Sequence, residues 1–495
     1  MVAEPTVIND ARPLIALLAP MVALAAIVWA GEKRKNLREI FTLVAGLVQA
    51  SVVLSLLPLV LAGNVVEFHI WQIFTNVPML LRVDGFGLTF AAVASVLWVA
   101  TSLYAIGYMR GLHEHAQTRF YSFFAISLCA TMGVAFSANL LTIYFFYEML
   151  SVSTYPLVTH MQDKNARKGG RTYLSYLLFT SLCLLLPALS WCYVWLDGGT
   201  VTMDFLADTG KVSFFSPTTQ LVLLLLFTFG FAKAGLMPLH SWLPNAMVAP
   251  TPVSALLHAV AVVKVGVFCV IRVYSDIFGI EVLQALDGEQ IMVWIACATI
   301  LISSLIALSQ DNLKRRLAFS TIGQLGYVVL GATLATKQGT GGAVVHIAMH
   351  ACGKITLFFC AGAILVASGK KYVSELRGLG RKMPFTMGAF LIGSLSVIGL
   401  PPLGGFVSKW YLVLGALDRD YVWVVVVLLL SSLLNVFYLL PVAVRAFFRN
   451  ENDDEEEEGG LKEAPWQCVV PLSCTALGCF GLFFFSDVLL SLAGL

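Results

Sequence analysis

The chain has 495 residues, of which 58% are hydrophobic and only 12% are charged, and its formal net charge is +2. Its mean hydropathy of +0.84 excludes a soluble globular protein and indicates a protein with many membrane spans. The ten cysteines form no CxxC pair, so their spacing predicts neither an iron–sulfur cluster nor a zinc site. The sequence also lacks glycine-rich nucleotide motifs and a Ser–His–Asp arrangement, so we expect no cofactor, no catalytic domain and no nucleic-acid partner.

Long apolar runs follow one another along the chain. Because a membrane-spanning helix needs about 20 apolar residues, these runs predict an all-α polytopic membrane protein with about fourteen transmembrane helices. The first run has no basic region ahead of it and is followed by basic residues, which is typical of a retained span and not of a cleaved signal peptide. The predicted helices cover residues 12–30, 40–62, 84–108, 120–137, 139–160, 172–196, 218–239, 253–275, 291–309, 318–336, 341–368, 385–415, 421–448 and 465–491.

The lysines and arginines are unevenly distributed between the loops that join these helices. One set of alternate loops carries 21 of the 31 lysines and arginines, and the other set carries six. Basic loops stay in the cytoplasm, so this asymmetry predicts that both termini lie outside the cytoplasm. One loop on the basic side contains an acidic run at residues 453–458, for which a solvated loop and a docking site for a basic partner are the alternatives.

Two predicted helices are interrupted by glycine and proline in similar sequences. Gly235 and Pro238 break helix 218–239, and helix 385–415 is broken by Gly399, Pro401 and Pro402. The two helices are five predicted helices apart, and an offset of five reverses the orientation in the membrane. The pattern therefore predicts two inverted five-helix repeats, with a transport site near the breaks. The repeats would occupy residues 120–275 and 291–448, after N-terminal helices in 1–119 and before a last helix in 465–495.

Three lysines, Lys233, Lys264 and Lys409, lie inside otherwise apolar runs. A lysine near the bilayer centre costs ~2.5–3.5 kcal/mol and is kept only where it faces protein or water. Glu148 is the only acid in helix 139–160. Either Glu148 pairs with Lys233 and sets the proton affinity of that amine, or it is a partner that only fixes helix packing.

Histidines accompany these lysines in two predicted helices. His346, His350 and Lys354 have i, i+4, i+8 spacing and form one titratable stripe, which suits proton relay. A histidine pair at this spacing can also hold a metal, but no third ligand is evident and we predict no metal site. His258 lies on a different face of its helix from Lys264. It either borders the same row of buried polar groups or is a core histidine whose ring nitrogens are hydrogen-bonded.

The segment His113-Glu114-His115 lies at a helix end or in the loop between the helices predicted at 84–108 and 120–137. A solvated or capping role fits these residues better than a catalytic one, because their spacing is not that of the HExxH metalloprotease motif.

Glu148, Lys233, the block PLHSWLPNAMVAPTPVSALLHAVAVVK and the segment GLPPLGGFVSKW together resemble a known family. The family comprises the antiporter-like subunits shared by respiratory complex I, Mrp-type Na+/H+ antiporters and membrane-bound hydrogenases, and the D-type subunit of Mrp antiporters is most similar. The resemblance runs from about the third to the thirteenth predicted helix. It implies fourteen helices, two inverted repeats and a polar axis across the membrane centre. It assigns ion-coupling roles to Glu148, Lys233, Lys264 and Lys409.

The sequence and the resemblance together predict a proton-translocating subunit of a multisubunit complex in a prokaryotic cytoplasmic membrane. Protons would reside on Lys233 and Lys264 and pass along His346, His350 and Lys354 to Lys409. We expect other membrane subunits and the lipid bilayer as partners, and Na+, K+ or H+ alone remain alternatives for the transported ions. An alternative is the proton-pumping membrane subunit of an NADH:quinone oxidoreductase or hydrogenase, with the redox chemistry in partner subunits. A quinone-binding redox protein and a transporter of an organic solute are further alternatives.

Overall fold

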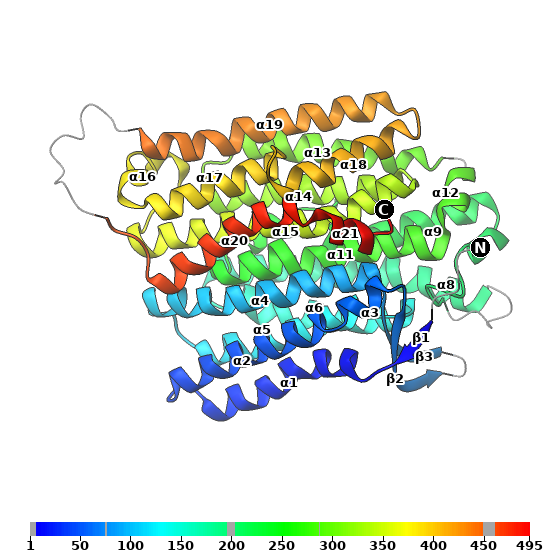
Figure 1. Ribbon diagram of the computed structural model, residues 1–495, viewed down its shortest axis with the longest axis horizontal. Coiled ribbons are helices and arrows are strands. Elements are labelled where there is room, and N and C mark those ends of the chain that lie inside the picture. The colour runs from blue at the N-terminus through cyan, green and yellow to red at the C-terminus, as the bar shows by residue number, and fades with distance from the viewer. Residues whose placement is uncertain (1–5, 75–76, 196–202, 287, 449–460) are drawn as a thin grey trace.

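The computed structural model describes residues 6–74, 77–195, 203–286, 288–448 and 461–495, and most of them belong to long helices that lie side by side (Figure 1). The acidic run 453–458 lies outside the described residues. The connection between α1 and α2 and the short helix α16 lie at one end of the bundle, at the left of Figure 1. A small sheet lies at the opposite end.

The helices of the first half of the chain are α1 (Arg12–Ala30), α2 (Lys35–Leu54), α3 (Leu57–Leu61), α4 (Gly85–Gly111), α5 (Gln117–Ala135), α6 (Leu140–Val158), α7 (Lys164–Thr180), α8 (Leu186–Trp195), α9 (Pro217–Gly230), α10 (Trp242–Ala246) and α11 (Val262–Arg272). The helices of the second half are α12 (Ile280–Ala285), α13 (Gln290–Ser309), α14 (Leu313–Thr333), α15 (Lys337–Ser368), α16 (Leu379–Lys382), α17 (Pro384–Ile398), α18 (Gly404–Leu417), α19 (Val422–Phe447), α20 (Trp466–Phe484) and α21 (Ser486–Leu492). Shorter π or 3-10 segments are η1 (Ser181–Leu185), η3 (Lys211–Phe214), η4 (Ala232–Ala234), η5 (Val253–Ala261), η6 (Val273–Phe278) and η7 (Val373–Glu375).

Polar caps decide where several helices begin. The side chain of Asn139 accepts a hydrogen bond from Thr142 N (2.9 Å) at the start of α6. Asp163 accepts one from Ala166 N (2.6 Å) at the start of α7, so that helix includes the basic residues before the apolar run predicted at 172–196. Each cap satisfies a backbone donor that the first turn of a helix leaves unpaired. A hydropathy window misses such turns because their residues are polar.

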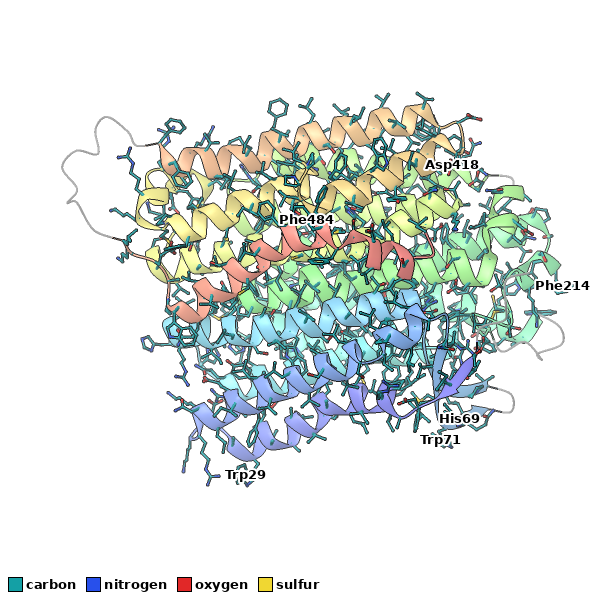
Figure 2. The ribbon with its side chains drawn as sticks, viewed as in Figure 1. Trp29, His69, Trp71, Phe214, Asp418 and Phe484 are labelled. Carbon is teal, nitrogen blue, oxygen red and sulfur yellow. The ribbon has the colours of Figure 1, made fainter. Side chains whose placement is uncertain are left out.

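The bundle has the surface of a membrane protein. Within the described residues, nine helices are long and apolar enough to cross a membrane, and Pro217–Gly230 and Pro384–Ile398 are shorter apolar helices. Large aromatic side chains point away from the bundle: Trp29 near one end and Trp71 and Phe214 near the other (Figure 2). These three side chains are 65%, 70% and 77% exposed. Aromatic rings at both ends of a bundle are typical of the two membrane–water interfaces.

A three-stranded sheet of β1 (Val7–Asn9), β2 (Val65–Phe74) and β3 (Val77–Val83) corrects the prediction of an all-α fold. β1 pairs with β2 in parallel, and β2 pairs with β3 in an antiparallel ladder interrupted by two register shifts. The apolar run 40–62 ends before β2, and the segment that forms β2 and β3 is too short to span a bilayer, so hydropathy alone does not reveal these strands. The prediction of a largely helical membrane protein is otherwise confirmed.

Candidate functional site

Two helices end at the glycine- and proline-rich segments singled out in the sequence. α9 ends at Gly230, and the chain continues through η4 to Gly235, whose φ of +69° is in the left-handed region. α17 ends at Ile398 and is followed by Gly399, whose φ is +91°. Such φ values favour glycine, because a side chain would be strained there. Each break places backbone carbonyls without helical partners in the protein interior.

Lys233 lies in the first break and is fully buried. Its Nζ donates to the backbone carbonyl of Tyr147 (2.9 Å) and to Ser151 Oγ (2.6 Å), both on α6. The amine also lies 3.1 Å from the centre of the Tyr147 ring, which favours a cation. The first break is therefore held against α6 by this amine and by the backbone N of Lys233, which donates to the Tyr147 hydroxyl (3.3 Å).

Glu148 also lies on α6, close enough to Lys233 for a favourable charge interaction. The direct contact that the sequence suggested is not formed, because the ion pairs among the described residues do not join these two side chains. Glu148 Oε1 is buried without a hydrogen-bond partner in the described structure. An unpartnered carboxylate oxygen beside a buried amine can accept a proton or a closer amine.

The centre of the bundle contains a second group of buried amines and imidazoles. Lys264 Nζ on α11 is hydrogen-bonded to Nδ1 of His350 on α15. His350 stacks on His346 one turn away, with ring centroids 5.7 Å apart and planes within 7°. The stripe that the spacing predicted is therefore formed, and α11 adds a lysine to it.

His346 and Lys354 extend this group in opposite directions along α15. His346 Nε2 donates to Gln324 Oε1 (3.2 Å), so Nδ1 of a neutral ring can accept from Ser408 Oγ (2.8 Å). Lys354 Nζ donates to Ser320 Oγ on α14, and the hydroxyl of Tyr438 lies 2.8 Å from the same oxygen. Hydroxyls and amides of this kind both donate and accept hydrogen bonds, which is what proton passage between fixed groups needs.

Lys409 on α18 lies at the second break. Its Nζ donates to the carbonyls of Val397 (3.0 Å) and Ile398 (2.8 Å) at the end of α17, and to Ser432 Oγ (3.2 Å). The carboxyl end of a helix carries partial negative charge and unpaired carbonyls, so it stabilises a cation there. Gly399 leaves space for this lysine, because a Cβ at that position would lie 2.8 Å from Lys409 Cδ.

The second group contains amines and imidazoles only. Charge interactions link His350 to Lys264, Lys354 and Lys409, and no acid of the described chain contributes to any of these groups. Two positive charges about 6 Å apart repel by roughly 3 kcal/mol at an effective dielectric constant of ~20. Such a group can hold few protons at a time.

His258 is placed apart from this group. Its ring is buried near Tyr173 and Trp242, with centroid distances of 6.3 and 6.4 Å, and neither ring nitrogen has a hydrogen-bond partner in the described structure. The ring is close enough to Lys314 on α14 for their charges to interact. His258 therefore lies between the buried axis and the basic end of the bundle.

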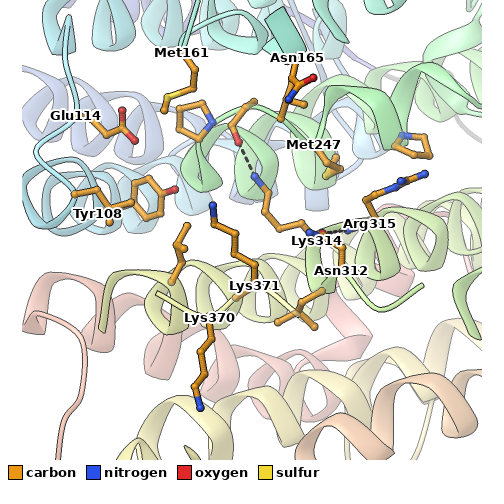
Figure 3. Close-up of a pocket in the computed structure, with 18 residues that line it drawn as sticks. Tyr108, Glu114, Met161, Asn165, Met247, Asn312, Lys314, Arg315, Lys370 and Lys371 are labelled. Carbon is orange, nitrogen blue, oxygen red and sulfur yellow. Dashed lines mark hydrogen bonds between the residues drawn. The ribbon is translucent and has the colours of Figure 1, made fainter. Parts of the chain in front are cut away.

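A cavity of about 590 Å³ opens at that basic end (Figure 3). Lys314, Arg315, Lys370 and Lys371 line it, and Glu114 is the acid in its lining. Lys314 reaches into the cavity wall and donates to the carbonyl of Ala249 (2.6 Å; Figure 3). The cavity brings solvent close to the part of the protein that contains His258.

The sequence did not single out the polar neighbours of the predicted lysines. Ser151, Ser320 and Ser408 bind the amines or imidazoles, but serine is common in membrane helices and its spacing gives no signal. Gly266 on α11 was also missed. A Cβ there would lie 2.1 Å from Ala234 N and 2.3 Å from Lys233 C, so this glycine lets α11 approach the first break. A glycine two residues after a lysine in an apolar run, in Lys264-Val265-Gly266, was the available signal.

The predicted residues other than His258 thus fall into two groups. Glu148 and Lys233 form the first, and the second consists of Lys264, His346, His350, Lys354 and Lys409. Gly266 brings α11 against the first break, although no hydrogen bond of the described residues links Lys233 directly to Lys264.

The chain is similar to known proteins in sequence and in fold. The family model for the transmembrane region of NADH:quinone oxidoreductase and Mrp antiporters matches residues 137–435. The chain is 35% identical over 354 residues to NADH-quinone oxidoreductase subunit N from Desulforudis audaxviator strain MP104C, which covers 71% of this chain and 69% of that protein. It is 31% identical over 401 residues to a probable K+/H+ antiporter A/B subunit from Rhizobium meliloti strain 1021, covering 81% of this chain but only 38% of that protein.

The fold is similar to that of a chain in the structure of the Mrp complex from Dietzia sp. DQ12-45-1b. The TM-score is 0.85 with 21% sequence identity, and the match covers 98% of this chain and 96% of that chain. At this identity the likeness concerns the fold.

Proposed function

Since this chain belongs to the NADH:quinone oxidoreductase/Mrp antiporter transmembrane family, we propose that it is a proton-translocating subunit of a multisubunit membrane complex. The observation that carries the proposal is the buried contact of Lys264 with the His346–His350 stack. Lysines in a hydrocarbon interior are kept where they pair with other groups or line an ion pathway. Amines and imidazoles do not carry out redox chemistry by themselves, but they can hold and release protons.

The proton path starts at the basic cavity, passes His258 and reaches the buried axis. It then follows Lys264, His350 and His346 to Ser408, which lies on the same helix as Lys409. Glu148 and Lys233 form the neighbouring unit, in which movement of the carboxylate toward or away from the amine changes the proton affinity of the lysine. Carrying one charge through 100 mV takes about 2.3 kcal/mol, which is similar in size to one buried charge–charge interaction at this dielectric constant.

The membrane arrangement that goes with this function has fourteen spans, with both termini outside the cytoplasm of a prokaryotic cell. Residues 120–275 and 291–448 are the two inverted five-helix repeats. They lie between the N-terminal helices of 1–119 and the last helix in 465–495. In support, both breaks have a left-handed glycine followed three residues later by proline, Gly235 with Pro238 and Gly399 with Pro402. The positive-inside distribution of lysines and arginines supports the orientation.

Two kinds of host complex fit this chain. In a cation/proton antiporter, proton movement through the chain would be exchanged for Na+ or K+, and the name of the Rhizobium relative supports this choice. In a redox-driven pump, an NADH:quinone oxidoreductase or hydrogenase, partner subunits would carry the electrons, and the name of the Desulforudis relative supports that alternative. The proteins that copurify with the chain distinguish the two: iron–sulfur or flavin proteins indicate the pump.

The test is proton transport by the purified complex in lipid vesicles, followed with a pH-sensitive dye. Lys264→Met keeps the length of the side chain but removes its titratable group. Lys337→Met is the matched control, because Lys337 is an exposed residue at the start of α15. We expect Lys264→Met to lose transport and Lys337→Met to retain it. Equal transport in both variants, with normal assembly, would end the proposal.

A further inference from the structure

A cluster of three possible metal ligands lies away from the buried axis, at the end of the bundle where α4 is joined to α5. Glu114 and His115 belong to the connection between these helices, and His160 follows α6. One ligand atom of each side chain can be chosen so that all three lie within 4.8 Å of one another. The sequence alone could not unite them, because His160 is 45 residues away from His115 along the chain.

His160 is the fixed member of the cluster. Its side chain is fully buried, and neither ring nitrogen has a hydrogen-bond partner in the described structure. The backbone of His115 lies near the ring without meeting hydrogen-bond geometry. A buried polar atom without a partner costs about 1–3 kcal/mol, so an imidazole in this state needs an explanation.

The surroundings hold this ring in place and leave the other two ligands adjustable. Phe120 packs edge-on against His160 at 5.8 Å, and Arg119 Nη2 donates to the His160 carbonyl (2.9 Å). His115 is exposed and Glu114 is half-buried, and the ring centroids of His115 and His160 are 4.9 Å apart. The backbone of Glu114 is anchored, because its N donates to Met109 O (2.9 Å) and its O accepts from Gln117 Nε2 (3.1 Å).

Two imidazoles and one carboxylate form a common ligand set for Zn2+, with a water in the fourth position. Bonds of about 2.0–2.1 Å in tetrahedral geometry place ligand atoms roughly 3.3 Å apart, so the cluster would need to contract by at most about 1.5 Å. Rotation of the exposed His115 and of Glu114 can provide that movement. The Glu114 carboxylate supplies one negative charge to a bound dication, and the nearby Arg119 and Glu32 act on the His160 ring with opposite sign.

We propose that Glu114, His115 and His160 form a binding site for a divalent cation of the zinc class. The bound ion would tie the α4–α5 connection to the end of α6, the helix that carries Glu148 and the hydrogen-bond acceptors of Lys233. It would also draw the Glu114 carboxylate away from the basic cavity that this side chain lines (Figure 3). The proposal is independent of the transport function, because binding is measured without transport.

The experiment is a titration of the purified, EDTA-treated complex with Co2+, whose absorption spectrum reports tetrahedral nitrogen and oxygen ligands and separates them from thiolates. We expect the wild-type complex to bind one more Co2+ per chain than His160→Gln, and Zn2+ to displace it. The His115→Gln variant should weaken binding by at least about 100-fold, since it removes a direct ligand, and even outer-shell changes typically cost 10–100-fold. His115 is exposed, so this variant tests the site even where His160→Gln fails to fold.

His69→Gln is the matched control, because His69 is an exposed histidine on β2 at the other end of the bundle. It should bind Co2+ like the wild type. Equal binding by the wild type and His115→Gln, or a thiolate spectrum, would overturn the proposal.

Discussion

The contact between α11 and the first helix break gives the sharpest prediction. Gly266 faces the break, and a Cβ at this position would lie 2.1 Å from Ala234 N, 2.3 Å from Lys233 C and 2.8 Å from Ala234 Cα. All three are backbone atoms, so no side chain can rotate away. In Gly266→Ala, α11 and the break must therefore move apart as whole segments.

The size of the movement follows from these distances. An ordinary van der Waals contact begins at 3.4 Å, so relieving the 2.1 Å contact requires a shift of about 1.3 Å. Overpacking a core typically costs about 1–3 kcal/mol of unfolding free energy. Displacing Lys233 by about 1 Å from Tyr147 and Ser151 is on the scale that lowers rates by roughly 100-fold. We therefore expect Gly266→Ala to assemble with reduced thermal stability and to lose most proton transport.

Gly388→Ala is the matched control for this substitution. Gly388 lies inside α17, and a Cβ there would meet no atom within 4 Å. Alanine is a better helix former than glycine by about 1 kcal/mol, so this variant should be as stable as the wild type or slightly more stable, with full transport. The assays are dye-monitored transport in vesicles and thermal unfolding of the purified complex. If Gly266→Ala and Gly388→Ala behave alike, the argument from close approach is wrong.

Three further substitutions test other contacts. Ser151→Ala removes the 2.6 Å hydrogen bond to the Lys233 amine, and the loss of a bond to a charged group, about 1.5–3 kcal/mol, should shift the pH dependence of transport while assembly stays normal. Gly399→Ala should lower the unfolding temperature more than Gly369→Ala, because both have positive φ but only Gly399 also faces a lysine; equal shifts would exclude a steric role for that lysine. Arg82→Ala leaves two carboxylates at the sheet end without their partner and should lower stability by about 3–5 kcal/mol, measured by thermal unfolding, with transport per assembled complex unchanged.

Much of this architecture could be predicted from local sequence. Apolar runs of span length located the helices, and Gly235 and Gly399 located the breaks because a left-handed backbone conformation favours glycine. Lys233, Lys264, Lys354 and Lys409 stood out because charge in an apolar run is rare and expensive. The i, i+4, i+8 spacing placed His346, His350 and Lys354 on one face, and the structure stacks the two rings. These features depend on neighbours along the chain, which any window of sequence contains.

The sequence by itself determined which amines and imidazoles enter the membrane interior and where two helices break. Only the tertiary structure decided what each of these groups touches. Lys233 binds Ser151 and the Tyr147 carbonyl rather than Glu148 directly, and Lys264 meets His350 across two helices. The pairing of β1 with β2 and the meeting of His115 with His160 are of the same kind. Such contacts join residues tens of positions apart, and helix packing sets their geometry, so no local pattern of residues encodes them.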